Sequence, residues 1–172
     1  AIRIDDTVTG APVVISGCTV RNYTNRFVYV SLSGKIESLT IDDCIFIGAD
    51  NSTTNKAIYA SSAHTQVETL SVTNSTFLNF NTGSNYFFRI NCGEELVLMP
   101  VVLIDHCTFY NCYDRRGVYL YNAGRSTIKN CISAFSERRD DTKSFTAYGD
   151  ESIVKNVISY NVDLYGSAPK EN

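Results

Sequence analysis

A short unit recurs six times along the chain and constrains the fold more than any other feature of the sequence. Each copy begins with Ile or Val, followed by a polar residue. The third residue is Gly, Asp, Asn or His, and the fourth is a small residue, usually Cys. The copies begin at residues 15, 41, 72, 104, 128 and 154. The first residue of the unit packs inward, the third suits a sharp bend in the backbone, and the fourth points inward again. Repetition of such a unit predicts a solenoid built from stacked coils.

A second apolar segment lies between successive units and has the alternation of a β-strand. The predicted members are Ile2–Ile4, Val28–Val30, Ile58–Ala60, Phe87–Arg89, Val118–Leu120 and Phe145–Ala147. A period of two places the first and third residues inside and the middle residue outside. Arg89 breaks this pattern, which predicts a bulge or a shifted register in its coil. Coils of 24 to 32 residues with two or three short strands each favour an all-β fold, a right-handed parallel β-helix of about six coils.

The sequence predicts one β-helix domain over residues 1–165 and a linker or disordered tail over residues 166–172. The chain opens directly in a strand-like pattern without a capping segment, so we expect a fragment of a larger protein, incomplete at one or both ends. No apolar run approaches the roughly 18 residues that a transmembrane helix needs. The net charge of −3 and the scattered basic residues argue against a nucleic-acid partner.

Four of the six cysteines occupy the fourth position of the unit: Cys18, Cys44, Cys107 and Cys131. Stacked side chains at this position would all point the same way, so we expect free, buried thiols that pack as small apolar residues. Cys92 and Cys112 fall outside the unit, and a disulfide between them is compatible with the sequence.

Two short segments resemble parts of pectate lyases. The run from Val102 to Phe109 is similar to a lyase strand that ends in Trp-Ile-Asp-His, and residues 2–6 resemble a strand that delivers calcium-binding aspartates. Together with the repeat, these segments make the chain resemble the pectin-lyase-like superfamily, and especially uncharacterised β-helix domains of Bacteroidetes surface proteins. The resemblance implies a secreted or cell-surface protein, extracellular or periplasmic, that engages a polysaccharide.

The resemblance also implies catalytic candidates. Arg115 and Arg116 would act as base or as neutraliser of a uronate carboxylate, with Asp105 and His106 in support. Calcium, if bound, would be coordinated by Asp5 and Asp6. Two carboxylates from one coil are fewer ligands than Ca²⁺ takes, so we expect no cofactor. Whether the chain is an enzyme stays open; if it is one, the resemblance favours a polysaccharide lyase.

An outward-facing aromatic stripe is the main candidate for carbohydrate binding. It comprises Tyr29, Tyr59, Phe88 and Tyr119, with Tyr121 and Tyr148 nearby. Aromatic faces on a rigid sheet suit the stacking of sugar rings. A structural aromatic ladder, covered by a loop or by another domain, would produce the same pattern.

Three functions remain compatible with the sequence. The favoured one is an extracellular polysaccharide-binding domain that is not catalytic, and the alternatives are a uronate lyase fragment and a surface adhesin or structural spacer. The expected partner is a polysaccharide or oligosaccharide, bound by a monomer with neighbouring domains in its parent protein.

Overall fold

The computed structural model describes residues 2–4, 10–23, 25–30, 35–48, 56–62, 66–80, 87–92, 101–112, 117–121, 124–135, 143–147 and 152–165. Over these residues the chain forms only β-strands and connecting turns, arranged in three sheets. No helix long and apolar enough to cross a membrane occurs in them.

The strands repeat in a fixed order around the coil. The first sheet contains β1 (Ile2–Ile4), β4 (Arg26–Val30), β7 (Lys56–Ser62), β10 (Phe88–Cys92), β13 (Val118–Tyr121), β16 (Lys143–Ala147) and β19 (Asp163–Tyr165). The second contains β2 (Pro12–Ser16), β5 (Lys35–Asp42), β8 (Gln66–Thr73), β11 (Val101–Asp105), β14 (Arg125–Lys129) and β17 (Ile153–Lys155). The third contains β3 (Thr19–Val20), β6 (Ile45–Ile47), β9 (Thr76–Leu78), β12 (Thr108–Tyr110), β15 (Ile132–Ala134) and β18 (Ile158–Tyr160).

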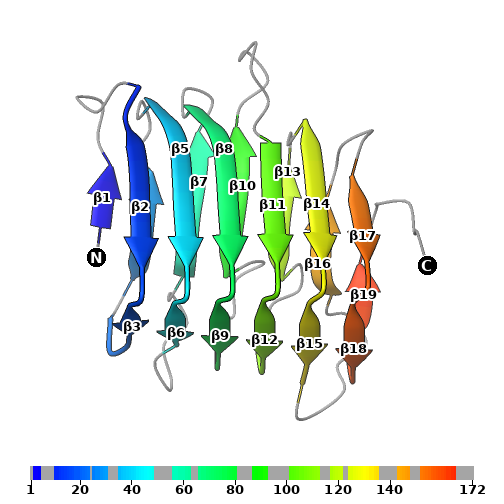
Figure 1. The fold of residues 1–172 in the computed structure, drawn as a ribbon. Coiled ribbons are helices and arrows are strands. Elements are labelled where there is room, and N and C mark those ends of the chain that lie inside the picture. The colour runs from blue at the N-terminus through cyan, green and yellow to red at the C-terminus, as the bar shows by residue number, and fades with distance from the viewer. Residues whose placement is uncertain are drawn as a thin grey trace.

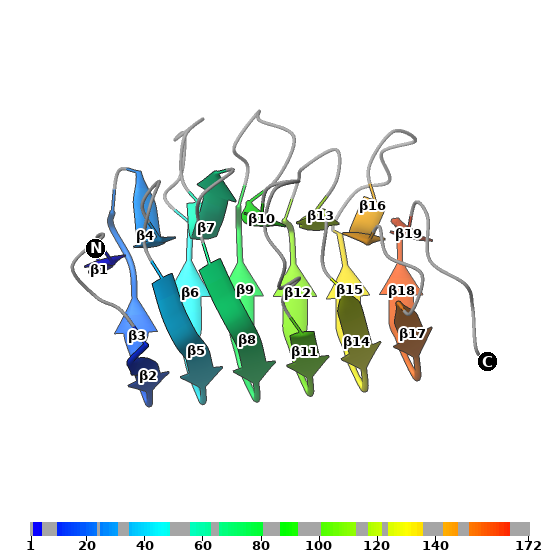
Figure 2. The ribbon, with the colours of Figure 1, turned by 90° about the horizontal axis from the view of Figure 1, so that it is seen from above.

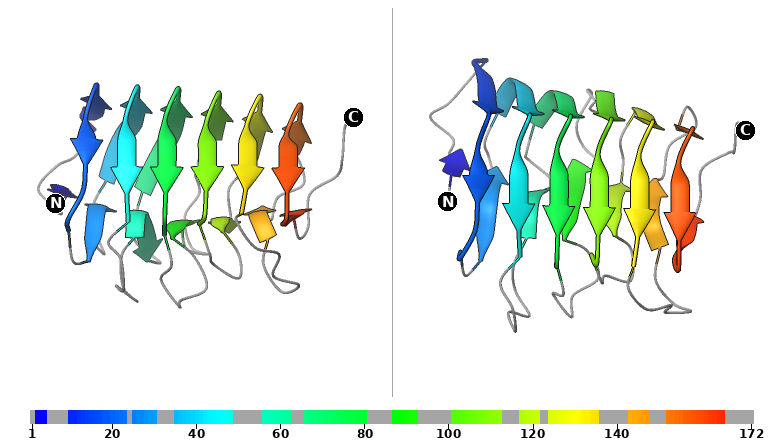
Figure 3. Two further views of the ribbon diagram at one scale, coloured as in Figure 1. Left: turned by 90° about the horizontal axis from the view of Figure 1, so that it is seen from below. Right: turned by 60° about the horizontal axis from the view of Figure 1, so that its bottom comes forward.

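Every strand pairs in parallel with its equivalent in the next coil, which confirms the predicted parallel β-helix. The coils succeed one another in chain order, with β1 and β19 at opposite ends of the stack (Figure 1). Seen from above, the three sheets run side by side along the stack (Figure 2), and the views from below and at a tilt show the same progression of coils (Figure 3).

The turn between the second and third sheets explains the polar half of the repeated unit. Its third position has a positive φ in every coil, at Gly17, Asp43, Asn74, His106, Asn130 and Asn156. Left-handed backbone is least costly for Gly, and Asn and Asp tolerate it better than other residues do. The turns also stack, since the amide of Asn74, for example, donates to the carbonyl of Asp105 in the next coil at 3.1 Å.

A second turn follows the third sheet. Asn22, Asn79, Asn111 and Asn161 adopt φ angles of 51° to 58° there. Gly48 occupies this position in its own coil, and its amide donates to the carbonyl of Leu78 at 2.8 Å. The recurring Asn two residues after the inward residue of the third sheet therefore marks this turn.

The interior is filled by apolar side chains that stack along the axis. Phe77 lies between Phe46 and Phe109, with ring centroids 5.0 and 5.1 Å away and interplanar angles of 4° and 10°. All three rings are buried. Among the described side chains at positions predicted to point inward, those that are exposed lie at the ends of the stack, where Cys18 and Ser159 lack a covering coil.

The cysteines of the repeated unit are free thiols, as the sequence predicts. Cys44, Cys107 and Cys131 are buried, and each thiol donates to a carbonyl oxygen two residues earlier in the chain. A hydrogen bond with Cys131, together with burial, raises the pKa of Cys107 and keeps its thiol protonated. Cys112 is likewise a buried thiol and not part of a disulfide, and its Sγ donates to the carbonyl oxygen of Phe77 at 3.5 Å.

The register of β10 differs from the predicted one by one residue. The prediction paired residues 87–89 with residues 58–60. In the structure, residues 88–90 pair with them, so that Arg89 lies beside Tyr59. Phe88 is consequently buried at 1% exposure and Arg89 points outward. The prediction that Phe88 lies on the outer face is wrong; the shifted register expected from Arg89 is the physical reason.

Candidate functional site

The outer face of the first sheet carries a row of Arg and Tyr side chains in register across five strands. The row consists of Arg3, Tyr29, Tyr59, Arg89 and Tyr119. Their neighbours along each strand, such as Val28 and Val30, are buried in the core, so the alternation of the strands sends the row outward. Parallel in-register pairing thus aligns side chains from distant parts of the sequence.

Arg26 joins this row from the start of β4. Its guanidinium carbon lies 4.5 Å from the ring centroid of Tyr29 and 4.2 Å from that of Tyr59. The two rings are 6.0 Å apart and tilted by 51°. A guanidinium this close to two aromatic faces is attracted by both ring quadrupoles. We call Arg3, Arg26, Tyr29, Tyr59 and Arg89 the Arg–Tyr ladder.

Arg3 and Arg89 extend the ladder on either side. Arg3 lies 5.8 Å from the Tyr29 ring, and Arg89 lies 5.8 Å from Tyr59 and 5.7 Å from Tyr119. Tyr119 faces outward but is only 6% exposed, so its ring is covered and offers little surface to a ligand. Tyr29 and Tyr59 remain partly exposed.

A surface pocket of about 340 Å³ opens at the β1 end of the ladder. Its lining residues are Ile2, Arg3, Asn25, Arg26 and Tyr29. Two Arg residues, an Asn and a Tyr therefore line one concave site. Such a combination of one apolar wall and a few polar groups is typical of small-ligand sites.

Of the aromatic residues predicted to bind carbohydrate, Tyr29 and Tyr59 lie together on the outer face of the sheet. Phe88 is in the core, and Tyr119 is covered. The Tyr121 side chain and all of Tyr148 lie outside the described residues. The aromatic surface is therefore shorter than the sequence suggests, and Arg3 and Arg89 flank it.

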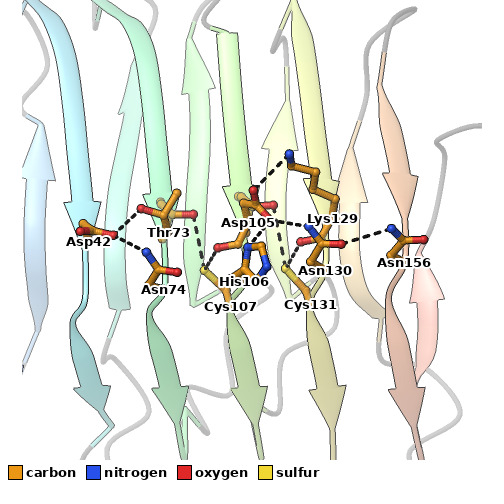
Figure 4. Close-up of polar contacts among 12 residues, drawn as sticks. Asp42, Thr73, Asn74, Asp105, His106, Cys107, Lys129, Asn130, Cys131 and Asn156 are labelled. Carbon is orange, nitrogen blue, oxygen red and sulfur yellow. Dashed lines mark hydrogen bonds and ion pairs between the residues drawn. The ribbon is translucent and has the colours of Figure 1, made fainter.

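The predicted supporting pair Asp105 and His106 lies at the corner between the second and third sheets (Figure 4), not on the first sheet. Asp105 Oδ1 is 2.8 Å from His106 Nδ1 and accepts a hydrogen bond from Asn130 Nδ2 at 2.8 Å. Lys129 Nζ lies 3.1 Å from Asp105 Oδ2. Asn156 continues the row by donating to Asn130 Oδ1 at 3.2 Å.

The same arrangement appears two coils earlier. Asp42 Oδ1 accepts hydrogen bonds from Thr73 Oγ1 at 2.6 Å and from Asn74 Nδ2 at 2.9 Å (Figure 4). His106 occupies the turn position that Asn74 and Asn130 fill in neighbouring coils, with the same positive φ. The Asp105–His106 pair is thus a member of a structural ladder of turn residues.

The acid groups of this turn ladder make stability depend on pH. Hydrogen bonds from Thr73 and Asn74 lower the pKa of Asp42. At Asp105, partial desolvation favours the neutral acid, but hydrogen bonds from Asn130 and Lys129 outweigh it and lower the pKa. A carboxylate whose pKa is lower in the folded state contributes stability above its unfolded pKa of about 3.9, and this stability is lost as the pH falls toward the folded value.

We therefore expect the chain to lose stability on acidification below about pH 4. Asp105→Asn should lower stability at pH 7 and reduce the loss between pH 7 and pH 3. Urea unfolding at both pH values measures this, with the exposed Glu68→Gln as the control variant. An equal loss of stability in the wild type and Asp105→Asn would contradict the assignment.

The remaining predicted site residues, Arg115, Arg116, Asp5 and Asp6, lie outside the described residues. Within the part of the chain that the structure describes, no three His, Cys, Asp or Glu side chains come together as a metal site would require.

Asn25 and Arg26 were not among the site residues predicted from the sequence. Arg89 was expected only to shift the register of its coil, and that shift places it in the outward row. Aligning residues 88–90 with 58–60 would have put Arg89 in the outward row beside Tyr59. Arg26 had a weaker signal, since it is the first residue of β4, two residues before the predicted segment Val28–Val30, and it pairs with the basic Lys56 in the next coil.

Comparison with known proteins finds one family similarity. Residues 4–80 match the model of a domain of unknown function, DUF4957. No curated protein and no solved structure matches the chain.

Proposed function

We propose that the chain is a polysaccharide-binding β-helix domain that holds its ligand against the Arg–Tyr ladder of the first sheet. The observation that carries the proposal is the in-register row of Arg3, Tyr29, Tyr59 and Arg89, in which the two Tyr rings are adjacent and partly exposed. A rigid sheet fixes these groups before a ligand arrives, which reduces the entropy lost on binding.

The dimensions of the ladder suit an extended chain. Arg3 to Arg89 span four neighbouring strands, which at a spacing of about 4.8 Å gives a row about 14 Å long. Tyr rings can stack on the apolar faces of sugars, while guanidinium groups donate hydrogen bonds to oxygen atoms around the ring. A linear glycan lying across the strands would meet both kinds of group in turn.

We also propose a family and a cellular location for the domain. A domain of this kind would belong with the pectin-lyase-like β-helices and work outside the cell or at its surface, where polysaccharides are found. The ladder needs no catalytic group to perform this role, and the Asp105–His106 pair is already engaged in the turns between the second and third sheets. We therefore favour binding over cleavage.

Removing one ring of the ladder should weaken binding. We expect Tyr59→Ala to raise the Kd for a bound polysaccharide about three- to tenfold, since an aromatic contact is worth about 0.5–1.5 kcal/mol. A glycan array first identifies the ligand, and titration calorimetry then compares the variants. Tyr110→Ala, which removes an exposed Tyr from the third sheet, is the matched control and should leave the Kd unchanged.

The outcomes separate the candidate functions. Equal affinities of Tyr59→Ala, Tyr110→Ala and the wild type would contradict binding at the ladder. Absence of binding to every polysaccharide tested would contradict the proposal and leave the spacer function. Release of unsaturated uronates, detected by ultraviolet absorbance, would favour the lyase instead.

A further inference from the structure

The pocket at the β1 end of the Arg–Tyr ladder has a chemistry of its own. Arg3 and Arg26 both line it, and both approach the ring of Tyr29, at 5.8 and 4.5 Å. Asn25, which precedes Arg26, also lines the pocket. The pocket therefore combines two permanent positive charges with one aromatic face.

The described contacts of the Arg26 guanidinium are with aromatic rings. Its guanidinium lies over both Tyr29 and Tyr59, and its Nε is buried without a hydrogen-bond partner among the described atoms. No described carboxylate forms an ion pair with it. Burying part of a guanidinium without an acceptor costs free energy, which an anionic ligand bound by its remaining N–H groups would offset.

The surrounding sheet reinforces this preference. Strands β1, β4, β7, β10 and β13 contain the basic residues Arg3, Arg26, Lys56 and Arg89 and no Asp or Glu. In the second sheet, by contrast, a single strand, β5, already contains two acidic residues, Glu37 and Asp42. Clustered charge of one sign along a surface attracts a ligand of the opposite sign.

We propose that this pocket binds the negatively charged substituent, a carboxylate or a sulfate, of an acidic saccharide. The inference rests on the proposed function and adds the class of glycan. The planar fork of a guanidinium matches two oxygens of either group, the Asn25 amide donates a further hydrogen bond, and the Tyr29 ring supports the sugar. The volume of about 340 Å³ is at the lower end for ligand sites and suits one sugar unit with its charged group.

The test compares charged and neutral forms of the same glycan on the full chain. The probes are an oligogalacturonate with its fully methyl-esterified form, and a sulfated galactan oligosaccharide with its desulfated form. We expect the wild type to bind one acidic probe at least about tenfold more tightly than its neutral partner, with a preference that declines as salt rises. The pair that shows the preference identifies the carboxylate or the sulfate.

Arg26→Gln should remove this preference. We expect it to lower the affinity for the acidic probe about tenfold and to change the affinity for the neutral probe little. Arg125→Gln, which removes an exposed Arg from the second sheet, is the matched control. Circular dichroism and thermal unfolding check that Arg26→Gln remains folded, and Arg26→Lys, which keeps the charge without the fork, should retain part of the preference.

The results distinguish this inference from the proposed function. Equal binding of acidic and neutral probes, still weakened by Tyr59→Ala, would overturn the charged pocket and leave the glycan-binding ladder. A preference for acidic probes that survives in Arg26→Gln would also overturn it. If no probe or polysaccharide binds, both proposals fail.

Discussion

Replacing Phe77 by Ala is expected to lower the free energy of unfolding by about 3–5 kcal/mol, the range for truncating a buried Phe. The ring is fully buried between those of Phe46 and Phe109, at centroid distances of 5.0 and 5.1 Å. It also meets Phe88 edge-on at 6.3 Å. Truncation therefore leaves a cavity in the middle of the stack and removes contacts with the coils on both sides.

Urea unfolding followed by far-ultraviolet circular dichroism measures this loss. Phe77→Leu, which keeps much of the volume, should cost clearly less than Phe77→Ala. Thr76→Ala changes the preceding, outward-facing residue of the same strand and should cost much less. Similar losses for Phe77→Ala and Thr76→Ala would mean that the aromatic stack is not a main source of stability.

Replacing Gly48 by Ala is expected to destabilise the chain by about 3 kcal/mol, the upper part of the usual range for overpacking. A Cβ atom at this position would lie 2.3 Å from the carbonyl oxygen of Asn79 and 2.9 Å from its carbonyl carbon. These are backbone atoms, and the stacking of coils fixes the backbones of both Gly48 and Asn79. The Gly48 amide donates to Leu78, and the Asn79 amide donates to Tyr110.

The matched control for Gly48→Ala is Gly17→Ala. A Cβ at Gly17 would meet nothing within 4 Å, so that variant tests only the cost of its positive φ of 64°. We expect that cost to be about 1–2 kcal/mol. Thermal and urea unfolding of both variants give the comparison. A smaller loss for Gly48→Ala than for Gly17→Ala would show that the coils can separate at Gly48 without penalty.

Much of the fold could be predicted because the coil repeats its chemistry. Asn74, Asn130 and Asn156 occupy positions of positive φ, which few residue types tolerate, and the turns were therefore readable from sequence. The buried Cys44, Cys107 and Cys131 share one place in the unit for a similar reason, since only small side chains fit there.

The register of β10 was harder to assign because two adjacent apolar residues begin the strand region. Phe87 and Phe88 are both buried, so alternation alone does not show which of them pairs with Ile58. Only pairing with the neighbouring coils selects Phe88 and turns Arg89 outward. A shift of one residue reverses every side chain of a strand, and this changed the composition of the outer face.

The candidate site was predictable only in part. The alternation of strands correctly placed Tyr29 and Tyr59 outside, since their neighbours are plainly apolar. The stacking of Arg26 on both rings depends on how the chain enters β4, and the covering of Tyr119 depends on surrounding structure. Neither follows from the spacing of residues along one strand.

The central claim, that glycans bind the Arg–Tyr ladder, is tested most directly by titrating the isotope-labelled chain with the best oligosaccharide from the array and following side-chain NMR signals. We expect the Tyr ring signals of Tyr29 and Tyr59 and the guanidinium signal of Arg26 to shift together along one saturation curve. The signals of His106 and Tyr110, which lie on other faces, should stay unchanged. Shifts centred on His106 with an unaffected ladder would contradict the claim.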